Sequence, residues 1–143
     1  MTYDRDASPG YLTNWAARLF ARALDRRLGG SGSGPMPVFF ALQDGGTLTQ
    51  KQLAQMAGVE QPTMANTLAR MERDGLIVRR PDPEDGRCAL VSLTAAGLKQ
   101  AARSFSAARA LNAVSVADLS PTEREQFLEL LHRIVAALER DLA

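Results

Sequence analysis

The side chains that could do chemistry in this sequence are polar and basic, and they gather in two stretches. In the first, residues 61–74, two hydroxyls, an amide and a guanidinium recur at i, i+3, i+4 and i+7. In a helix this spacing puts all four on one face, opposite the apolar residues. These groups can hydrogen-bond to base edges and phosphates, so the face is a candidate nucleic-acid contact. Its residues are Thr63, Asn66, Thr67 and Arg70.

The second stretch, residues 76–93, carries arginines and changes to a strand-like pattern. Two apolar runs flank the turn-rich segment 81–86, which predicts a β-hairpin. Arg79, Arg80 and Arg87 belong to this hairpin. A polar helix face alone would also fit a helix that meets only solvent. The basic hairpin that follows makes DNA binding the favoured interpretation.

One cysteine and one histidine leave little room for other chemistry. They cannot supply a disulfide framework, and they argue against a zinc site or a catalytic triad. The sequence contains neither a Gly-rich phosphate loop nor a nucleophile–base set, so we predict a protein that is not an enzyme and needs no cofactor or metal. Cys88 leaves a redox-responsive alternative open, because oxidation beside Arg87 would disturb the hairpin.

Length and composition fit one soluble globular domain. The chain has 143 residues, 45% of them hydrophobic and 23% charged, and its net charge is +1. No apolar run approaches the roughly 18–20 residues that span a bilayer. The first residues include Asp4 and Asp6 and lack the apolar stretch of a secretion signal. We therefore expect a cytoplasmic protein without a membrane partner.

The elements that must position the candidate residues are mostly helical. Residues 1–10 are predicted to be a flexible arm, and 11–28 an amphipathic helix of about five turns. The Gly/Ser-rich hexapeptide 29–34 is predicted to be a flexible loop. Pro35 and Pro37 then open a short apolar segment.

Two closely spaced helices precede the hairpin. Thr49 and Gln52 form a capping box at the start of the first helix, and Gly58 fits its C-terminal end. The second helix has Pro62 in its first turn and ends at Gly75. Two helices joined by a short turn containing Gly are typical of a helix-turn-helix.

Two further helices complete the chain. Thr94 can cap a helix that runs to about Asn112, and Ser120 with Glu123 forms another capping box. The last helix is apolar over much of its circumference, so it needs two packing partners. These are either the core of a monomer or, as we favour, a second copy of the chain. Its apolar residues are Phe127, Leu128, Leu130, Leu131, Ile134, Val135, Leu138 and Leu142.

Residues 47–97 resemble the MarR (multiple antibiotic resistance regulator) family of bacterial winged-helix transcription regulators. Segments 48–54, 59–63 and 68–77 carry the resemblance, together with the wing signature D-x-R-x-x-x-V-x-L-T that begins at Asp85. The resemblance implies a mainly α fold with a small β-wing. In it, residues 35–94 are the winged helix-turn-helix lobe, and the N- and C-terminal helices, within 11–34 and 95–143, form a dimer.

The resemblance also implies a role for each candidate residue. The helix that begins near Gln61 would enter the major groove, and Thr49 and Gln50 would touch phosphate. Arg87 would reach into the minor groove with Asp85 holding its guanidinium, although Asp85 could equally be a turn-forming residue only. The DNA-binding residues are then Thr49, Gln50, Gln61, Pro62, Thr63, Asn66, Thr67, Arg70, Arg79, Asp85 and Arg87.

We therefore expect a homodimeric, sequence-specific repressor of transcription that binds a near-palindromic operator, with half-sites roughly 34 Å apart. The resemblance implies release from DNA by a small aromatic anion. The alternatives are a redox-responsive regulator that uses Cys88 and a winged-helix module that binds proteins. The second alternative is open because residues 47–94 have equal numbers of basic and acidic residues. The candidate ligand-binding residues are Tyr11, Trp15, Arg18, Arg22, Met36 and Phe39.

Overall fold

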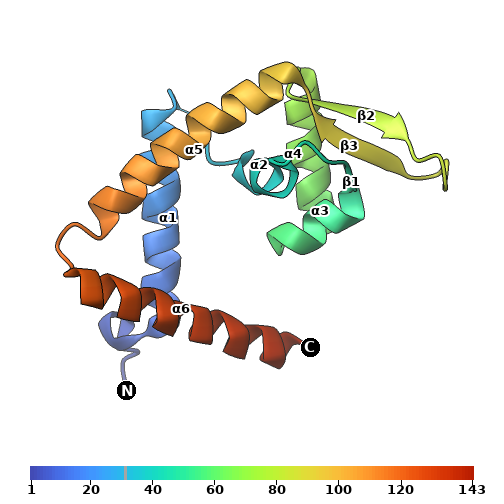
Figure 1. Ribbon diagram of the computed structural model, residues 1–143. Coiled ribbons are helices and arrows are strands. Elements are labelled where there is room, and N and C mark those ends of the chain that lie inside the picture. Colours follow the sequence, from blue (N-terminus) through green and yellow to red (C-terminus); the bar gives the residue numbers. More distant parts are fainter. Residues whose placement is uncertain (31) are drawn as a thin grey trace. The chain divides into compact units, whose positions relative to one another are not determined.

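The computed structural model describes residues 1–30 and 32–143; Ser31, in the predicted Gly/Ser loop, lies outside the described residues. The protein is mainly helical with one small antiparallel sheet (Figure 1), as predicted. The chain divides into two compact units, residues 1–108 and 109–143. None of the described helices is long and apolar enough to cross a membrane.

The predicted N-terminal arm, residues 1–10, has regular structure in its second half, whereas residues 1–4 belong to no helix or strand. Arg5–Ala7 form a 3-10 turn, and helix α1 spans Pro9–Arg27, two residues earlier than expected. Ser8 explains the early start, because its side chain accepts a hydrogen bond from the Tyr11 backbone N–H at 3.1 Å. Proline at the first helical position adds to this signal.

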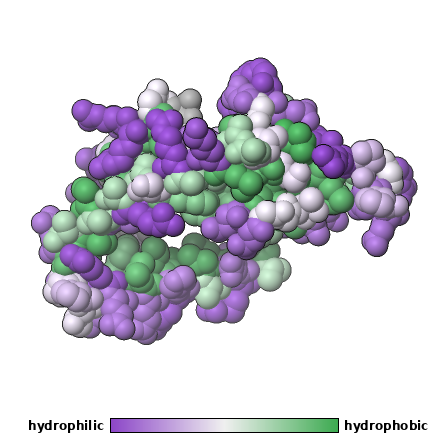
Figure 2. Space-filling view, turned by 45° about the horizontal axis from the view of Figure 1, so that its top comes forward, coloured by the Kyte–Doolittle hydropathy of each residue, from purple (hydrophilic) through white to green (hydrophobic). Residues whose placement is uncertain are grey.

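Helix α1 buries little of its apolar stripe. Leu24 and Leu28 are buried, whereas Leu12, Trp15 and Leu19 are 42–45% exposed. Hydrophobic side chains of this kind form green patches on the surface in Figure 2. An apolar stripe left this open is a candidate contact surface.

The loop after α1 is held by a carboxylate rather than free. Asp25 Oδ1 accepts hydrogen bonds from the backbone N–H groups of Gly32 at 2.8 Å and Ser33 at 2.6 Å. The Ser33 backbone hydrogen bond is the main reason that the pKa of Asp25 lies below its usual value. Two described residues of the predicted flexible loop 29–34 are thus tied to α1 by backbone hydrogen bonds.

Three short helices enclose the core of the first unit. They are α2 (Met36–Leu42), α3 (Gln50–Ala57) and α4 (Gln61–Arg73). Each buries apolar positions against the core, and in α3 and α4 this burial fixes the direction of the polar face. The most deeply buried large apolar side chains are Val38, Phe39, Leu42, Leu53, Met64, Leu68, Met71, Ile77 and Val91.

The sheet has three strands in the order β1-β3-β2. The hairpin of β2 (Ile77–Pro81) and β3 (Ala89–Leu93) was predicted, with strands beginning at residues 76 and 87. Strand β1 (Leu48–Thr49) was not, because two residues are too few to show an alternating pattern. It pairs antiparallel with β3, Leu48 opposite Val91. This pairing joins the base of the hairpin to the start of α3.

Helix α5 (Ala95–Ser115) packs closely against the turn after α4. The Thr94 hydroxyl accepts a hydrogen bond from the Gly97 N–H at 3.0 Å and donates one to the Gly75 carbonyl at 2.6 Å. Thr94 thereby caps the helix as predicted, although the helix runs three residues beyond Asn112. A Cβ at Gly97 would lie 2.0 Å from the Leu76 carbonyl oxygen, so only glycine fits there.

The second unit contains helix α6 (Pro121–Leu142), which starts at the predicted capping box of Ser120 and Glu123. The Ser120 backbone N–H lowers the pKa of Glu123 by donating to its carboxylate. Arg124 closes the preceding turn, with Nε 3.1 Å from the carbonyls of Val116 and Leu119. No residue of α6 is buried, so its apolar residues remain open.

Candidate nucleic-acid interface

Helix α4 presents the polar face that the sequence predicted. Met64, Leu68 and Met71 are at most 2% exposed, and they hold the opposite face in the core. Thr63, Asn66 and Arg70 are exposed. Thr67 is half-buried, and its hydroxyl donates to the Thr63 carbonyl at 3.2 Å, which leaves it as an acceptor.

The start of α4 is also open. Gln61 and Pro62 are exposed, and the N-cap residue Glu60 makes no side-chain hydrogen bond to the helix. The first backbone N–H groups of a helix have no partner within it. Together with the helix dipole, they can bind an anion such as a phosphate.

A hollow of about 360 Å³ joins α3, α4 and the hairpin. It brings together predicted residues from four places in the chain. It also includes Lys51, which was missed because its closeness to the hairpin depends on the β1–β3 pairing. Lys51 and Arg87 offer positive charge to a polyanion at this hollow, whereas Arg79 is paired with Glu72. The polar and charged residues of its lining are Thr49, Gln50, Lys51, Gln61, Arg79 and Arg87.

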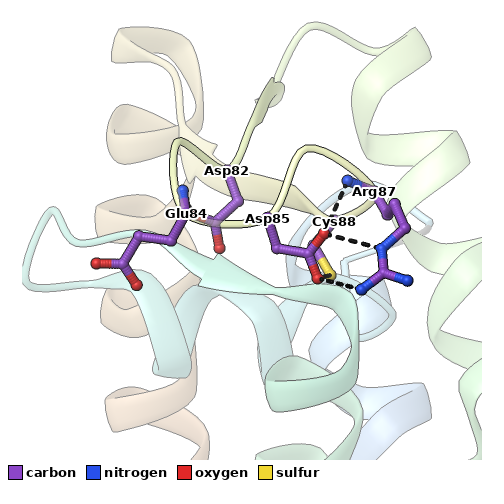
Figure 3. Close-up of polar contacts among 5 residues, drawn as sticks. All are labelled: Asp82, Glu84, Asp85, Arg87 and Cys88. Carbon is purple, nitrogen blue, oxygen red and sulfur yellow. Dashed lines mark hydrogen bonds and ion pairs between the residues drawn. The ribbon is translucent and has the colours of Figure 1, made fainter.

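One carboxylate organises the tip of the hairpin (Figure 3). Asp85 Oδ1 lies 3.1 Å from Arg87 Nε, and Oδ2 lies 3.3 Å from Nη2, so the guanidinium is held in a fork. The Arg87 side chain is nevertheless 91% exposed. Its hydrogen bond to Asp85 lowers the pKa of that carboxyl group. Asp85 thus holds Arg87, and the alternative of a turn-forming role alone is wrong.

Cys88 lies outside the strand in which it was predicted. It directly precedes β3, it is exposed, and its Sγ donates to Asp85 Oδ2 at 3.7 Å. The Cys88 thiol therefore has a carboxylate neighbour as well as the nearby arginine.

The two remaining arginines of the hairpin differ. Arg80 is exposed on β2, whereas Arg79 turns toward α4, with Nε 3.5 Å from Glu72 Oε2. Only 28% of the Arg79 side chain is exposed. Arg79 thus has a partner within the protein, which the sequence did not reveal because helix and strand had to be placed first.

The predicted ligand-binding residues come from two helices, α1 and α2. Met36 and Phe39 are 7% and 0% exposed and belong to the core, so little of either side chain is open to a ligand in this conformation. The other four lie on α1, where the Arg18 guanidinium sits 5.3 Å from the centre of the Trp15 ring. These four residues are Tyr11, Trp15, Arg18 and Arg22.

A groove that the sequence did not predict lies beside α4. It has a volume of about 410 Å³, within the size range of small-molecule sites. One side of the groove is the loop whose Ser33 backbone N–H donates to Asp25, and the other side includes Thr67 and Arg70 of α4. The Gly-rich loop gave no sequence signal for this groove, because its shape depends on the two hydrogen bonds to Asp25.

Helices α3 and α4 with the β2–β3 hairpin define a winged helix-turn-helix protein. Residues 35–87 match the model of the MarR family. The chain is 34% identical to the transcriptional regulator HosA of Escherichia coli O111:H- over 100 residues, which are 70% of this chain and 74% of HosA. The protein belongs to the MarR family of DNA-binding transcription regulators.

Two further comparisons agree with this assignment. The chain is 30% identical to the HTH-type transcriptional repressor NicR of Pseudomonas putida over 95 residues, 66% of this chain and 60% of NicR. The crystal structure of the PcaV transcriptional regulator from Streptomyces coelicolor in complex with its natural ligand is similar in fold, with a TM-score of 0.84 and 27% identity. That match covers 96% of this chain and 99% of PcaV.

Proposed function

We propose that this protein is a homodimeric, sequence-specific repressor whose affinity for DNA is lowered by a small aromatic anion. The observation that carries the proposal is the exposed polar face of α4 beside a hairpin that presents Arg87. The relative NicR, a transcriptional repressor, supports the direction of regulation.

Each part of the surface has a task on DNA. Thr63, Asn66 and Arg70 of α4 contact base edges in the major groove, where each base pair shows a distinct set of donors and acceptors. The open start of α4 and the hollow around Lys51 bind backbone phosphates. Arg87 enters the minor groove, whose negative potential is strongest where the groove is narrow.

The open apolar surfaces support a dimer. Eight large apolar residues lie on α6, and seven of them are 39–84% exposed. A second copy of the chain would remove them from water, and two-fold symmetry would present two copies of α4 to two half-sites. The operator is therefore near-palindromic.

The proposed effector binds along α1. Trp15 and Tyr11 offer aromatic surface, and Arg18 and Arg22 offer positive charge for a carboxylate. PcaV, of similar fold, binds its own natural ligand, which supports a small-molecule effector here. The dimer has two states, one with its two copies of α4 spaced for DNA and one with the wrong spacing. An effector that binds the second state more tightly lowers DNA affinity, by an amount set by the difference between its own affinities for the two states.

Selection of bound duplexes from random DNA, repeated at two salt concentrations, tests the proposal. We expect enrichment of a near-palindrome, with half-sites about one turn apart, and affinity that falls steeply with salt through counterion release. Weak binding with no enriched sequence would contradict sequence-specific recognition and favour a module that binds proteins. Repeating the selection with oxidised protein tests the Cys88 alternative, with Cys88→Ser as the control.

A reporter assay separates repression from activation. With the selected site placed over a promoter, the protein should lower expression, and aromatic carboxylates that bind the protein should restore it. The Arg18→Gln variant should repress normally and respond less to the same acid. An equal response would exclude Arg18 from the effector site.

A further inference from the structure

Arg79 lies on the inner face of the sheet, an unusual place for an arginine. Alternate residues of a strand share a face, so Arg79 lies on the same side of β2 as Ile77, which is 2% exposed. Its cross-strand partner Val91 is 1% exposed. Arginine is seldom buried unless it is paired, because its charge loses the solvation of water. This position therefore calls for an opposite charge.

Glu72 supplies that charge from the last turn of α4. The chain reverses directly after α4: Gly75, with φ of 75°, donates to the Glu72 carbonyl, and Leu76 donates to that of Met71. Strand β2 then begins, and Glu72 Oε2 lies 3.5 Å from Arg79 Nε. Among the described residues this Nε has no hydrogen-bond partner, so the Glu72 carboxylate is what offsets its burial.

We infer that the Glu72–Arg79 pair positions the wing relative to the recognition helix α4, and that Arg79 is a positioning residue rather than a DNA contact. This inference rests on the proposed function, in which α4 and Arg87 touch the same duplex. The two grooves they read have a fixed separation, so the base of the wing must hold a fixed position against α4. The pair joins the two elements at that base.

The direction in which one substitution changes DNA affinity tests the pair. Removing a carboxylate near DNA ordinarily strengthens binding, because it removes repulsion from phosphate. If Glu72 holds Arg79, Glu72→Gln should instead weaken binding to the selected operator, by about five- to tenfold. The matched control is Glu84→Gln, which removes an exposed carboxylate from the wing tip without touching the pair. We expect this control to bind as the unchanged protein does, or slightly more tightly.

A double-mutant cycle separates positioning from general damage. If the pair acts by placing Arg87, then Glu72→Gln should cost less than about twofold when Arg87→Ala is already present. A fold defect would cost the same in both backgrounds. Thermal unfolding of each variant, followed by circular dichroism, shows whether it is folded at the temperature of the binding assay.

The salt dependence of Arg79→Gln distinguishes the pair from a phosphate contact. When Arg87→Ala is already present, loss of a phosphate contact at Arg79 would still lower the slope of log affinity against log salt by about 0.9, whereas loss of the pair should leave that slope unchanged. The exchanged variant Glu72→Arg/Arg79→Glu should recover most of the affinity lost in either single variant.

Three results would overturn the inference: unchanged or tighter binding by Glu72→Gln, additivity with Arg87→Ala, or a lower salt slope when Arg79→Gln is added to Arg87→Ala. All require that the unchanged protein binds the operator. Absence of that binding would instead refute the proposed function.

Discussion

At the wing tip, a single carboxylate decides how an exposed arginine is presented. A free Arg87 side chain would sample many rotamers and lose that freedom on entering a groove. Two hydrogen bonds to Asp85 fix the guanidinium beforehand, although 91% of the side chain meets solvent. Preorganisation of this kind lowers the entropic cost of binding. The hydrogen bonds from Arg87 also lower the pKa of Asp85, which further favours its charged form.

Arg87→Ala should weaken operator binding by about 1–3 kcal/mol, because it removes the proposed minor-groove contact. Fluorescence anisotropy with the selected duplex measures the change. Arg80→Ala is the matched control, since it removes the same charge from the exposed side of β2. Equal losses for the two variants would mean that the wing contributes only general positive charge.

The elements whose signals are local could be read from the sequence. The capping boxes of Thr49 and Ser120 and the glycine turn at Gly75 involve residues at most five positions apart, so the sequence alone contains them. The polar face of α4 follows from helical periodicity in the same way. These local signals were enough to predict the winged helix-turn-helix and the polar face of α4.

Features that join distant segments could not be read in this way. The hydrogen bonds of Asp25 to the loop, the pairing of β1 with β3 and the Glu72–Arg79 pair all depend on how elements meet. The burial of Met36 and Phe39 also depends on how elements meet. Helical periodicity alone could not tell whether these side chains face the core or a ligand site. Arg79 was therefore predicted as a DNA contact before its partner was known.

The contact between α5 and the turn after α4 predicts a glycine that cannot be replaced. Gly97→Ala would place a Cβ 2.0 Å from the Leu76 carbonyl oxygen, so the backbone must move. We expect a loss of about 1–3 kcal/mol or more in the free energy of unfolding, measured by urea denaturation. Gly86→Ala is the control, because no atom lies within 4 Å of the added methyl group. Similar stability of both variants would contradict this packing.

The loop after α1 predicts an acid-dependent stability. The pKa of Asp25 is lowered mainly by the Ser33 backbone N–H, so the carboxylate is favoured in the folded state. The contribution of this carboxylate to the free energy of unfolding is present when the pH is above the pKa of the unfolded state. It is lost as the pH falls through the lower pKa of the folded state. The stability gap between the unchanged protein and Asp25→Asn should therefore narrow from pH 7 to pH 3. A gap that stays constant in urea denaturation would show that the charge of Asp25 does not matter.

At the scale of the whole molecule, charge cannot explain how this protein selects DNA. The net charge is +1, and acidic and basic residues are balanced across 47–94. Net charge therefore adds little attraction, and in the proposed dimer specificity comes from base contacts made twice, once by each copy of the chain. When two protomers that each bind a half-site weakly are linked in one dimer, the affinity for the full site rises by about 10²–10⁴-fold, with no additional contact to DNA. DNA binding should thus depend on the apolar surfaces that we propose as the dimer interface.

Leu138→Glu in α6 tests this dependence. Leu138 is 58% exposed, so a charge there should leave the protomer folded and should disfavour burial against a second copy. We expect a monomer in analytical ultracentrifugation, with affinity for the full operator about 100-fold lower. Affinity for an isolated half-site should be nearly unchanged. Glu139→Gln, one residue further along the same helix, is the control and should remain dimeric. A Leu138→Glu protein that stays dimeric would exclude this face of α6 from the interface, whereas a monomer with full affinity would separate DNA recognition from dimer formation.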